Sequence, residues 1–155
     1  MPESILVPLF LSLDSLIVSM AIVMLGIPSA KPLRLGAAFM IFDGLATLTG
    51  LSIHGALAPL LLCAYLALLL AVAARSPWRR ALWAPALFSL DNLIVAMGAK
   101  PGLGNGIWVD SLTAALTSGL LALAGIGIAM AIVRNAPRRY SYCLGLILLV
   151  TAICL

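Results

Sequence analysis

Six long apolar segments, separated by short turns rich in Gly, Pro and basic residues, occupy almost the whole of this sequence. The segments cover approximately residues 4–26, 33–52, 56–74, 80–98, 110–133 and 139–155. A helix that crosses a bilayer needs about 20 mainly apolar residues, so each segment is close to the required length. Hydrophobic residues make up 64% of the chain and charged residues only 9%, far fewer than in a soluble domain. We therefore predict an all-α integral membrane protein, a single domain over residues 1–155 with six transmembrane helices.

Most basic residues lie in the first, third and fifth turns between these segments. They are Lys31, Arg34, Arg75, Arg79, Arg80, Arg134, Arg138 and Arg139. Successive helices cross in opposite directions, so these three turns share one side of the membrane, and the other side has only Lys100. The positive-inside rule places the basic side in the cytoplasm and both termini outside the plasma membrane. Because these charges orient helices and do not alternate with aromatic residues, the net charge of +4 indicates no nucleic-acid partner.

An internal repeat relates the first and fourth segments at an offset of 77 residues. Residues 8–20 read PLFLSLDSLIVSM, and residues 85–97 read PALFSLDNLIVAM. Leu and Val matches are common in apolar segments, but a Pro, a Ser and an Asp shared in register are not. Since the first and fourth helices must cross in opposite directions, we predict an inverted 3+3 repeat with halves at approximately residues 1–76 and 77–155. Transporters built in this way bind their substrate near the membrane midplane, where the repeats meet.

Three aspartates, Asp14, Asp43 and Asp91, lie near the middle of the first, second and fourth segments. An aspartate at the bilayer centre costs about 2.5–3.5 kcal/mol on insertion scales, and no Lys or Arg lies at a similar depth to compensate. The carboxyl groups are then protonated, face a water-filled cavity or bind a cation. A single buried Asp can also serve only as a protonated link between helices. Because Asp14 and Asp91 are related by the repeat, with Asp43 within reach, we favour a site for a transported cation.

Neighbouring polar residues complete a candidate ligand set for this cation. Ser12, Ser89 and Asn92 each lie within two residues of an aspartate in the sequence. The repeat also matches a glycine, because Gly50 of the second segment corresponds to Gly127 at the same offset. Carboxylate, hydroxyl and amide oxygens suit Mg²⁺, Ca²⁺ or Mn²⁺, whereas Zn²⁺ and copper favour imidazole and thiolate. The predicted metal ligands are Asp14, Asp43, Asp91, Ser12, Ser89 and Asn92. The metal is the substrate of this site, and we expect no resident cofactor.

The two Ser-Leu-Asp motifs, residues 12–14 and 89–91, resemble the paired motifs of the MntP family of manganese exporters, part of the lysine-exporter-like superfamily. The second segment also looks like the second helix of that family. Its matching residues are Phe39, Phe42, Asp43 and Gly50. The resemblance implies six helices in two halves with external termini, and manganese efflux across a bacterial plasma membrane driven by an ion gradient. It also implies that Asp14 and Asp91 are the principal transport residues and Asp43 a third.

These observations predict a secondary transporter, not an enzyme, that exports a divalent metal cation, Mn²⁺ above all, in exchange for protons. Its predicted partners are the metal ion and the lipid bilayer. An exporter of another cation or small solute on the same superfamily fold remains an alternative. A six-helix thiol-redox protein would need paired cysteines at equivalent places, but Cys63 and Cys143 differ by 80 positions, near but not at the repeat offset, and neither lies beside the aspartates. A scaffold subunit is a further alternative, although it has no need of three deep acids.

Overall fold

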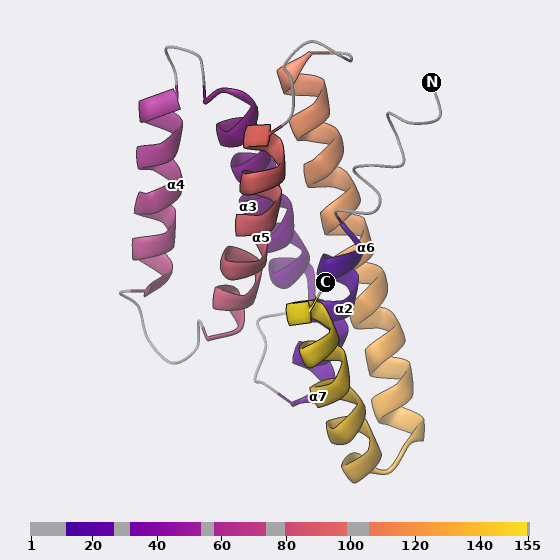
Figure 1. Ribbon diagram of the computed structural model, residues 1–155. Coiled ribbons are helices and arrows are strands. Elements are labelled where there is room, and N and C mark those ends of the chain that lie inside the picture. The colour runs from indigo at the N-terminus through magenta and orange to yellow at the C-terminus, as the bar shows by residue number, and fades with distance from the viewer. Residues whose placement is uncertain (1–11, 27–31, 54–57, 74–79, 99–105, 155) are drawn as a thin grey trace.

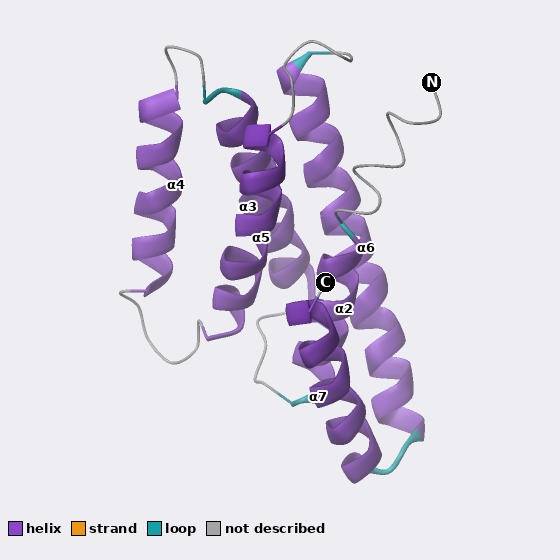
Figure 2. Cartoon of the chain, in the orientation of Figure 1, coloured by secondary structure: helices purple, strands orange, loops and turns teal. Residues whose placement is uncertain are grey.

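The computed structural model describes residues 12–26, 32–53, 58–73, 80–98 and 106–154, which form six α-helices and no strand (Figure 1; Figure 2). The helices are α2 (Leu13–Met24), α3 (Pro32–Leu51), α4 (Ala58–Ala73), α5 (Arg80–Gly98), α6 (Ile107–Asn135) and α7 (Arg138–Cys154). The prediction of six helices is confirmed for the described residues. The last five predicted segments agree with the helices to within a few residues. The first predicted helix begins at residue 4, and residues 1–11 lie outside the described part.

Glycine and proline determine where several helices begin and end. Gly26 follows α2 with a φ of 64°, a left-handed value that glycine adopts without steric cost, so the helix stops there. Pro32 begins α3, where its missing N–H leaves no intrahelical hydrogen bond unmade. Gly106, with a φ of 96°, precedes α6. Within α6, Asp110 in the first turn and Arg134 in the last turn both complement the helix dipole.

The helices pack as two groups of three that are joined along α3 and α6 (Figure 1). In one group α3 and α5 are in extensive contact, and α4 packs more loosely against both. In the other group α2 packs against α6 and α7, which have little contact with each other. The helices that carry the Ser-Leu-Asp motifs, α2 and α5, touch only over a small area. Each motif helix therefore packs mainly on helices from the opposite half of the sequence.

Successive helices run in alternating directions, so α2 and α5 are antiparallel (Figure 1). The described arginines gather at one end of the bundle, because they fall at the starts of α3, α5 and α7 and at the end of α6. They are Arg34, Arg80, Arg134, Arg138 and Arg139. Asp110, in the first turn of α6, lies at the opposite end. We call the two ends of the bundle the arginine end and the Asp110 end.

Many polar side chains lie inside the bundle, and many apolar side chains lie outside it. The core contains apolar clusters that include Val18, Phe39 and Ile126, but serine, threonine, asparagine and aspartate side chains are buried as well. The outer faces carry large apolar side chains such as Leu33, which is 73% exposed, and Ile153, which is 70% exposed. Two described helices, α3 with 20 residues and α6 with 29, are long and apolar enough to cross a membrane. Insertion of all six helices stays a prediction.

Candidate functional site

The three aspartates come from helices α2, α3 and α5. Asp14 lies in the first turn of α2, whereas Asp43 and Asp91 lie well inside α3 and α5. Asp43 is almost completely buried, with 1% of its surface exposed, and Asp14 is 9% exposed, while Asp91 is exposed in the described part of the chain. The prediction that Asp14 lies in the middle of a helix depends on residues 4–11, which lie outside the described residues.

The structure brings the three carboxyl groups together. Those of Asp14 and Asp91 are close enough for a hydrogen bond between them when one is protonated. Asp43 lies near both, and the three groups repel one another when all are ionised. No Lys or Arg of the described residues takes part in these contacts. Like charges held this close without a basic partner favour a proton or a cation between them.

Ser15 links two of the aspartates through its hydroxyl group. Its Oγ donates to Asp43 Oδ2 at 3.0 Å and to Asp14 Oδ1 at 3.2 Å. Its backbone N–H also donates to Asp14 Oδ1 at 2.6 Å, as is favourable for a carboxylate at a helix N-terminus. Ser118 of α6 and Asn92 of α5 lie beside Asp43 as well. Of these three neighbours, only Asn92 belongs to the predicted ligand set.

Two buried polar atoms at this site have no hydrogen-bond partner in the described structure. They are Oδ2 of Asp14 and Nδ2 of Asn92, a residue that is only 3% exposed. A buried polar atom without a partner costs about 1–3 kcal/mol, and more when it is charged. A cation bound at Asp14 Oδ2 would remove that cost. Rotation of the Asn92 amide would present its oxygen to the same ion.

The two predicted serine ligands make their hydrogen bonds with other hydroxyl groups beside the site. Ser12 Oγ lies 3.0 Å from Thr117 Oγ1 and accepts a hydrogen bond from Ser118 Oγ at 3.0 Å. Ser89 Oγ lies 2.7 Å from the Tyr65 hydroxyl and donates to a backbone carbonyl of its own helix at 3.0 Å. Each motif serine therefore joins its chain segment to a neighbouring helix. Their role as metal ligands stays a prediction.

The carboxyl groups do not form a ready-made metal cage. Across the described ranges, no three acidic, histidine or cysteine side chains are grouped so as to hold an ion. A cation here would be held by two carboxylates at a time, with hydroxyl and amide groups and retained water completing its shell. Mg²⁺ is commonly bound in this way, through one or two carboxylates and several waters.

Comparisons of this chain with protein families, curated proteins and solved structures give no match. The resemblance of the Ser-Leu-Asp motifs to those of manganese exporters therefore stays an expectation from the sequence. The chemistry of the site has to be argued from its own residues and contacts.

A second internal match, between α3 and α6, contributes to the site and was not among the sequence predictions. Residues 43–50 read DGLATLTG, and residues 118–125 read SGLLALAG, at an offset of 75 residues. Both stretches have a Gly-Leu pair, a second Leu three residues after the first Leu, and a second Gly two residues after the second Leu. It makes Ser118 the counterpart of Asp43, and Ser118 indeed lies beside Asp43. This pattern is the sequence signal that could have identified Ser118.

The second glycine of this pattern lets each helix approach a motif helix closely. A methyl group at Gly50 would lie 2.7 Å from the Leu93 carbonyl oxygen, and one at Gly125 would lie 2.5 Å from the Leu16 carbonyl oxygen. Leu16 and Leu93 are counterparts, because each follows the aspartate of its motif by two residues. Gly127, the predicted counterpart of Gly50, has no such neighbour within 4 Å. Gly125, and not Gly127, is therefore the structural counterpart of Gly50.

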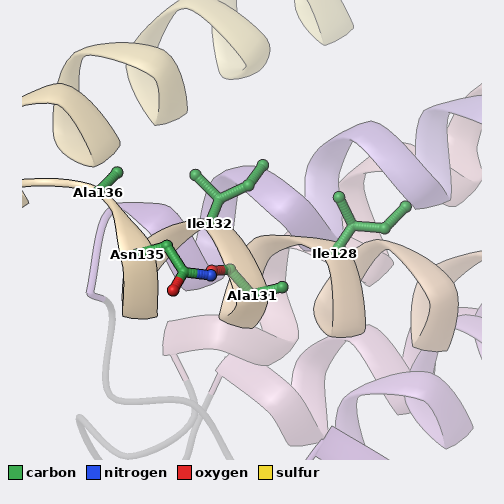
Figure 3. A pocket seen from close by; sticks show the side chains of 5 residues that line it. All are labelled: Ile128, Ala131, Ile132, Asn135 and Ala136. Carbon is green, nitrogen blue, oxygen red and sulfur yellow. The ribbon is translucent and has the colours of Figure 1, made fainter.

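An apolar groove with a volume of about 480 Å³ lies at the arginine end of α6 (Figure 3). It is lined by Ile128, Ala131, Ile132, Asn135 and Ala136. Ile128 and Ile132 point to the same side of α6. Because none of the lining residues is charged, this groove adds nothing to the candidate cation site.

Proposed function

We propose that this protein is a membrane transporter that exports a hard divalent cation, in particular Mn²⁺, in exchange for protons. The observation that carries the proposal is the contact between Asp14 and Asp91. Two antiparallel helices with the same motif supply these groups, and Asp43 adds a third carboxyl group beside them. Since no described basic side chain offsets their charge, a travelling cation or proton is the natural counter-charge.

The distribution of side chains supports a place in a plasma membrane. On α5, Ile94 and Val95 are exposed, while Ser89 and Asn92 are buried. Burying polar groups and exposing large apolar ones is unfavourable in water and favourable in lipid. The arginine end fits the positive-inside rule, which puts that end in the cytoplasm and both termini outside.

The helix contacts support an inverted repeat. Exchanging α2 with α5 and α3 with α6 turns the main contact of one helix group into that of the other, although α7 packs more closely on α2 than α4 does on α5. Gly50 on α3 meets α5 as Gly125 on α6 meets α2, and the exchanged helices run in opposite directions (Figure 1). Transporters with inverted repeats bind substrate where the repeats meet, and the three aspartates come from helices of both halves.

The candidate ligand atoms are all hard oxygens. They belong to the carboxylates of Asp14, Asp43 and Asp91, the hydroxyl of Ser15 and the amide of Asn92, with Ser12 and Ser89 near by. Such atoms favour Mn²⁺, Mg²⁺ or Ca²⁺ over Zn²⁺ or copper, and the resemblance of the motifs favours Mn²⁺. Protons compete with the cation for the same carboxylates, so loading the cation releases protons and unloading it takes them up. This competition is the basis of the proposed antiport.

The division of the site between the two helix groups provides a way to open it. Asp14 belongs to the group of α2, α6 and α7, whereas Asp43 and Asp91 belong to the group of α3, α4 and α5. Relative rotation of the groups would part the carboxylates on one side of the membrane and then on the other. The groups meet closely at Gly44 and Gly119, where the lack of a side chain lets α3 and α6 approach each other.

Mn²⁺ flux across liposomes that contain the purified protein tests this proposal. Asp14→Asn and Asp91→Asn keep the side-chain size and remove the charge, so we expect each to lower flux by about tenfold or more. Asp110→Asn is the matched control, because Asp110 lies in the first turn of α6 and apart from the three carboxyl groups. Undiminished flux in both site variants would remove the proposed role of the carboxylates. A wild-type protein that moves no Mn²⁺ at all would remove the proposal itself.

Competition and labelling separate the remaining alternatives. Addition of Mg²⁺, Ca²⁺ or another divalent ion to the same liposomes shows which cation displaces Mn²⁺, and an exporter of another solute would show no competition. Cys63, Cys143 and Cys154 are free and exposed. Alkylation of these thiols should leave cation flux unchanged, whereas loss of flux would favour the thiol-redox alternative.

A further inference from the structure

The apolar groove at the arginine end lies at the junction of α6 and α7, apart from the three aspartates (Figure 3). Only two residues link these helices, yet the helices have little contact with each other. The last two turns of α6 and Ala136 of the link line the groove, and Ile128 and Ile132 point to the same side of α6. Asn135 Nδ2 donates to the Ala131 carbonyl of its own helix at 2.8 Å. The groove is therefore mainly apolar, and its volume of about 480 Å³ is in the range of ligand sites.

Three of the five described arginines flank this groove, and all three are exposed. They are Arg134, Arg138 and Arg139. The first is the neighbour of the lining residue Asn135, and the second follows Ala136 by two positions. Successive Cα atoms are about 3.8 Å apart, so the backbone of each lies within about 8 Å of the groove lining. No Asp or Glu follows Asp110 in the sequence, and Asp110 lies at the opposite end of the bundle. The end of the groove therefore has three positive charges that no described carboxylate offsets.

We propose that this groove binds one anionic phospholipid, with an acyl chain along α6 and the phosphate group at the three arginines. This inference rests on the membrane location in the proposed function, and not on cation transport. From Ala136 back to Ile128 the groove follows roughly 12 Å of helix, at about 1.5 Å per residue. One leaflet contributes roughly 15 Å of a hydrocarbon core about 30 Å thick, so a chain in the groove stays within one leaflet. Tyr140, 73% exposed in the first turn of α7, lies at the same end, as aromatic residues do at the headgroup level.

Charge complementarity decides between the possible occupants of the groove. A guanidinium group binds a phosphate through two parallel hydrogen bonds, and only an anionic headgroup brings a net negative charge to the three arginines. A second copy of this chain is a poor occupant, because a two-fold dimer through this face would place the same arginines against each other. The repeat does not account for these charges, since residues 44–74, the counterpart stretch of the first half, contain no Lys or Arg. The positive-inside rule puts this end in the cytoplasm, and the cytoplasmic leaflet carries the anionic lipids.

Native mass spectrometry of the full-length protein in detergent tests the role of the arginines. The protein is titrated with phosphatidylglycerol, which is anionic, or with phosphatidylcholine, which has no net charge, each with the same acyl chains. We expect the wild type to bind phosphatidylglycerol roughly tenfold more tightly or better. Replacement of the three arginines by Gln in one chain should abolish this preference, and replacement by Lys should keep most of it. Arg34→Gln is the matched control, because Arg34 is also exposed but lies at the start of α3, in the other helix group.

A second variant tests the groove without changing any charge. Ala131→Phe fills the groove, so we expect the affinity for both lipids to fall by roughly tenfold. Ala124→Phe is the matched control, because Ala124 is also exposed on α6 but does not line the groove. Inorganic phosphate should not displace the bound lipid, since it leaves the groove empty.

The outcomes separate this inference from the proposed transport. Equal affinity of the wild type for the two lipids would overturn it, whatever the variants do. An equal loss in Arg34→Gln or Ala124→Phe would overturn it too, because the effect would not belong to this groove. Displacement by phosphate would reduce the site to the arginines alone, and a dimer that Ala131→Phe dissociates would assign the groove to a second copy. Preference for phosphatidylglycerol in a protein that moves no Mn²⁺ would support the lipid site and remove the proposed transport, and Mn²⁺ flux without this preference would do the reverse.

Discussion

Asp43 is the most deeply buried of the three carboxyl groups, and its contacts are with hydroxyl and amide groups rather than with a base. Replacing it by Asn keeps its size and removes its charge. We expect Asp43→Asn without cations to unfold at a higher temperature than the wild type, because repulsion by Asp14 and Asp91 is lost. Addition of Mn²⁺ at 100 times its dissociation constant should stabilise the wild type by about 2.7 kcal/mol, and the variant far less.

Thermal unfolding in detergent, with and without Mn²⁺, measures both effects for Asp43. Asp110→Asn serves as the control, and its unfolding should respond to Mn²⁺ as the wild type does. An equal response to Mn²⁺ in Asp43→Asn would show that Asp43 does not hold the ion.

The residues of the site were only partly predictable from the sequence, for a physical reason. The contact between Asp14 and Asp91 follows from the repeat, which places equivalent carboxyl groups on antiparallel helices. Ser15 and Ser118 were not included in the predicted ligand set, because the motif does not show which hydroxyl reaches a neighbouring helix. That depends on the register of α2 against α6, which the close approach of Gly125 to Leu16 determines.

At the scale of helices, Gly50 lets α3 pack closely on α5, and Gly125 lets α6 pack closely on α2. A methyl group at Gly50 would lie 2.5 Å from the Ala96 Cβ and 2.7 Å from the Leu93 carbonyl oxygen, distances that force α3 away from α5. We expect Gly50→Ala and Gly125→Ala to lower the unfolding temperature clearly. Gly127→Ala is the matched control: with no neighbour within 4 Å, it should be neutral or stabilising by up to about 1 kcal/mol. Equal behaviour of the three variants would contradict this packing.

Tyr65 attaches the peripheral helix α4 to the rest of its group. It is the single buried side chain among the α4 residues whose exposure is described, 59–68 and 70. Its ring packs against Phe42, and its hydroxyl bonds to Ser89 at 2.7 Å. Tyr65→Phe loses only the hydroxyl, which costs on the order of 0.6 kcal/mol between membrane helices. Tyr65→Ala also loses the ring, so we expect faster amide hydrogen exchange in α4 for the Ala variant and nearly unchanged exchange for the Phe variant.

Controls for Tyr65 come from the opposite helix group. Exchange in α7, which does not contact α4 extensively, should be the same in both variants. Faster exchange throughout the protein would show global destabilisation instead of release of α4.

The bounds of the helices were predictable from the sequence, whereas the contacts between helices were not. Apolar length and the Gly and Pro breaks gave the bounds of α5 at Arg80 and Gly98, and those of the other helices nearly as well. The crossing of the two sequence halves, with α2 on α6 and α7, was not foreseen. Hydropathy reports how much of each helix is apolar, but contacts depend on small residues such as Gly125 and Gly145, whose partners lie elsewhere in the chain.

At the scale of the whole molecule, the arginines and the buried carboxylates fit one orientation in the membrane. Arginines lie at one end, Asp110 lies at the other, and the three aspartates lie between them. In the proposed exchange, protons enter the site from outside the cell and the cation leaves toward the outside. An inward proton gradient would then drive the cation outward, which is the direction expected of an exporter.

Thiol labelling measures the orientation of the chain in the membrane. Helix α7 has 17 residues, or roughly 25 Å at about 1.5 Å per residue, so its two ends should lie on opposite sides of the membrane. A protein that keeps Cys154 and has Ser at Cys63 and Cys143 should react with a membrane-impermeant maleimide on intact cells. Asn135→Cys, with all three native cysteines replaced by Ser, places an exposed thiol at the arginine end and should react only after the membrane is opened. Labelling of both thiols from outside would show that α7 does not cross, and the reverse pattern would place the arginine end outside, against the positive-inside rule.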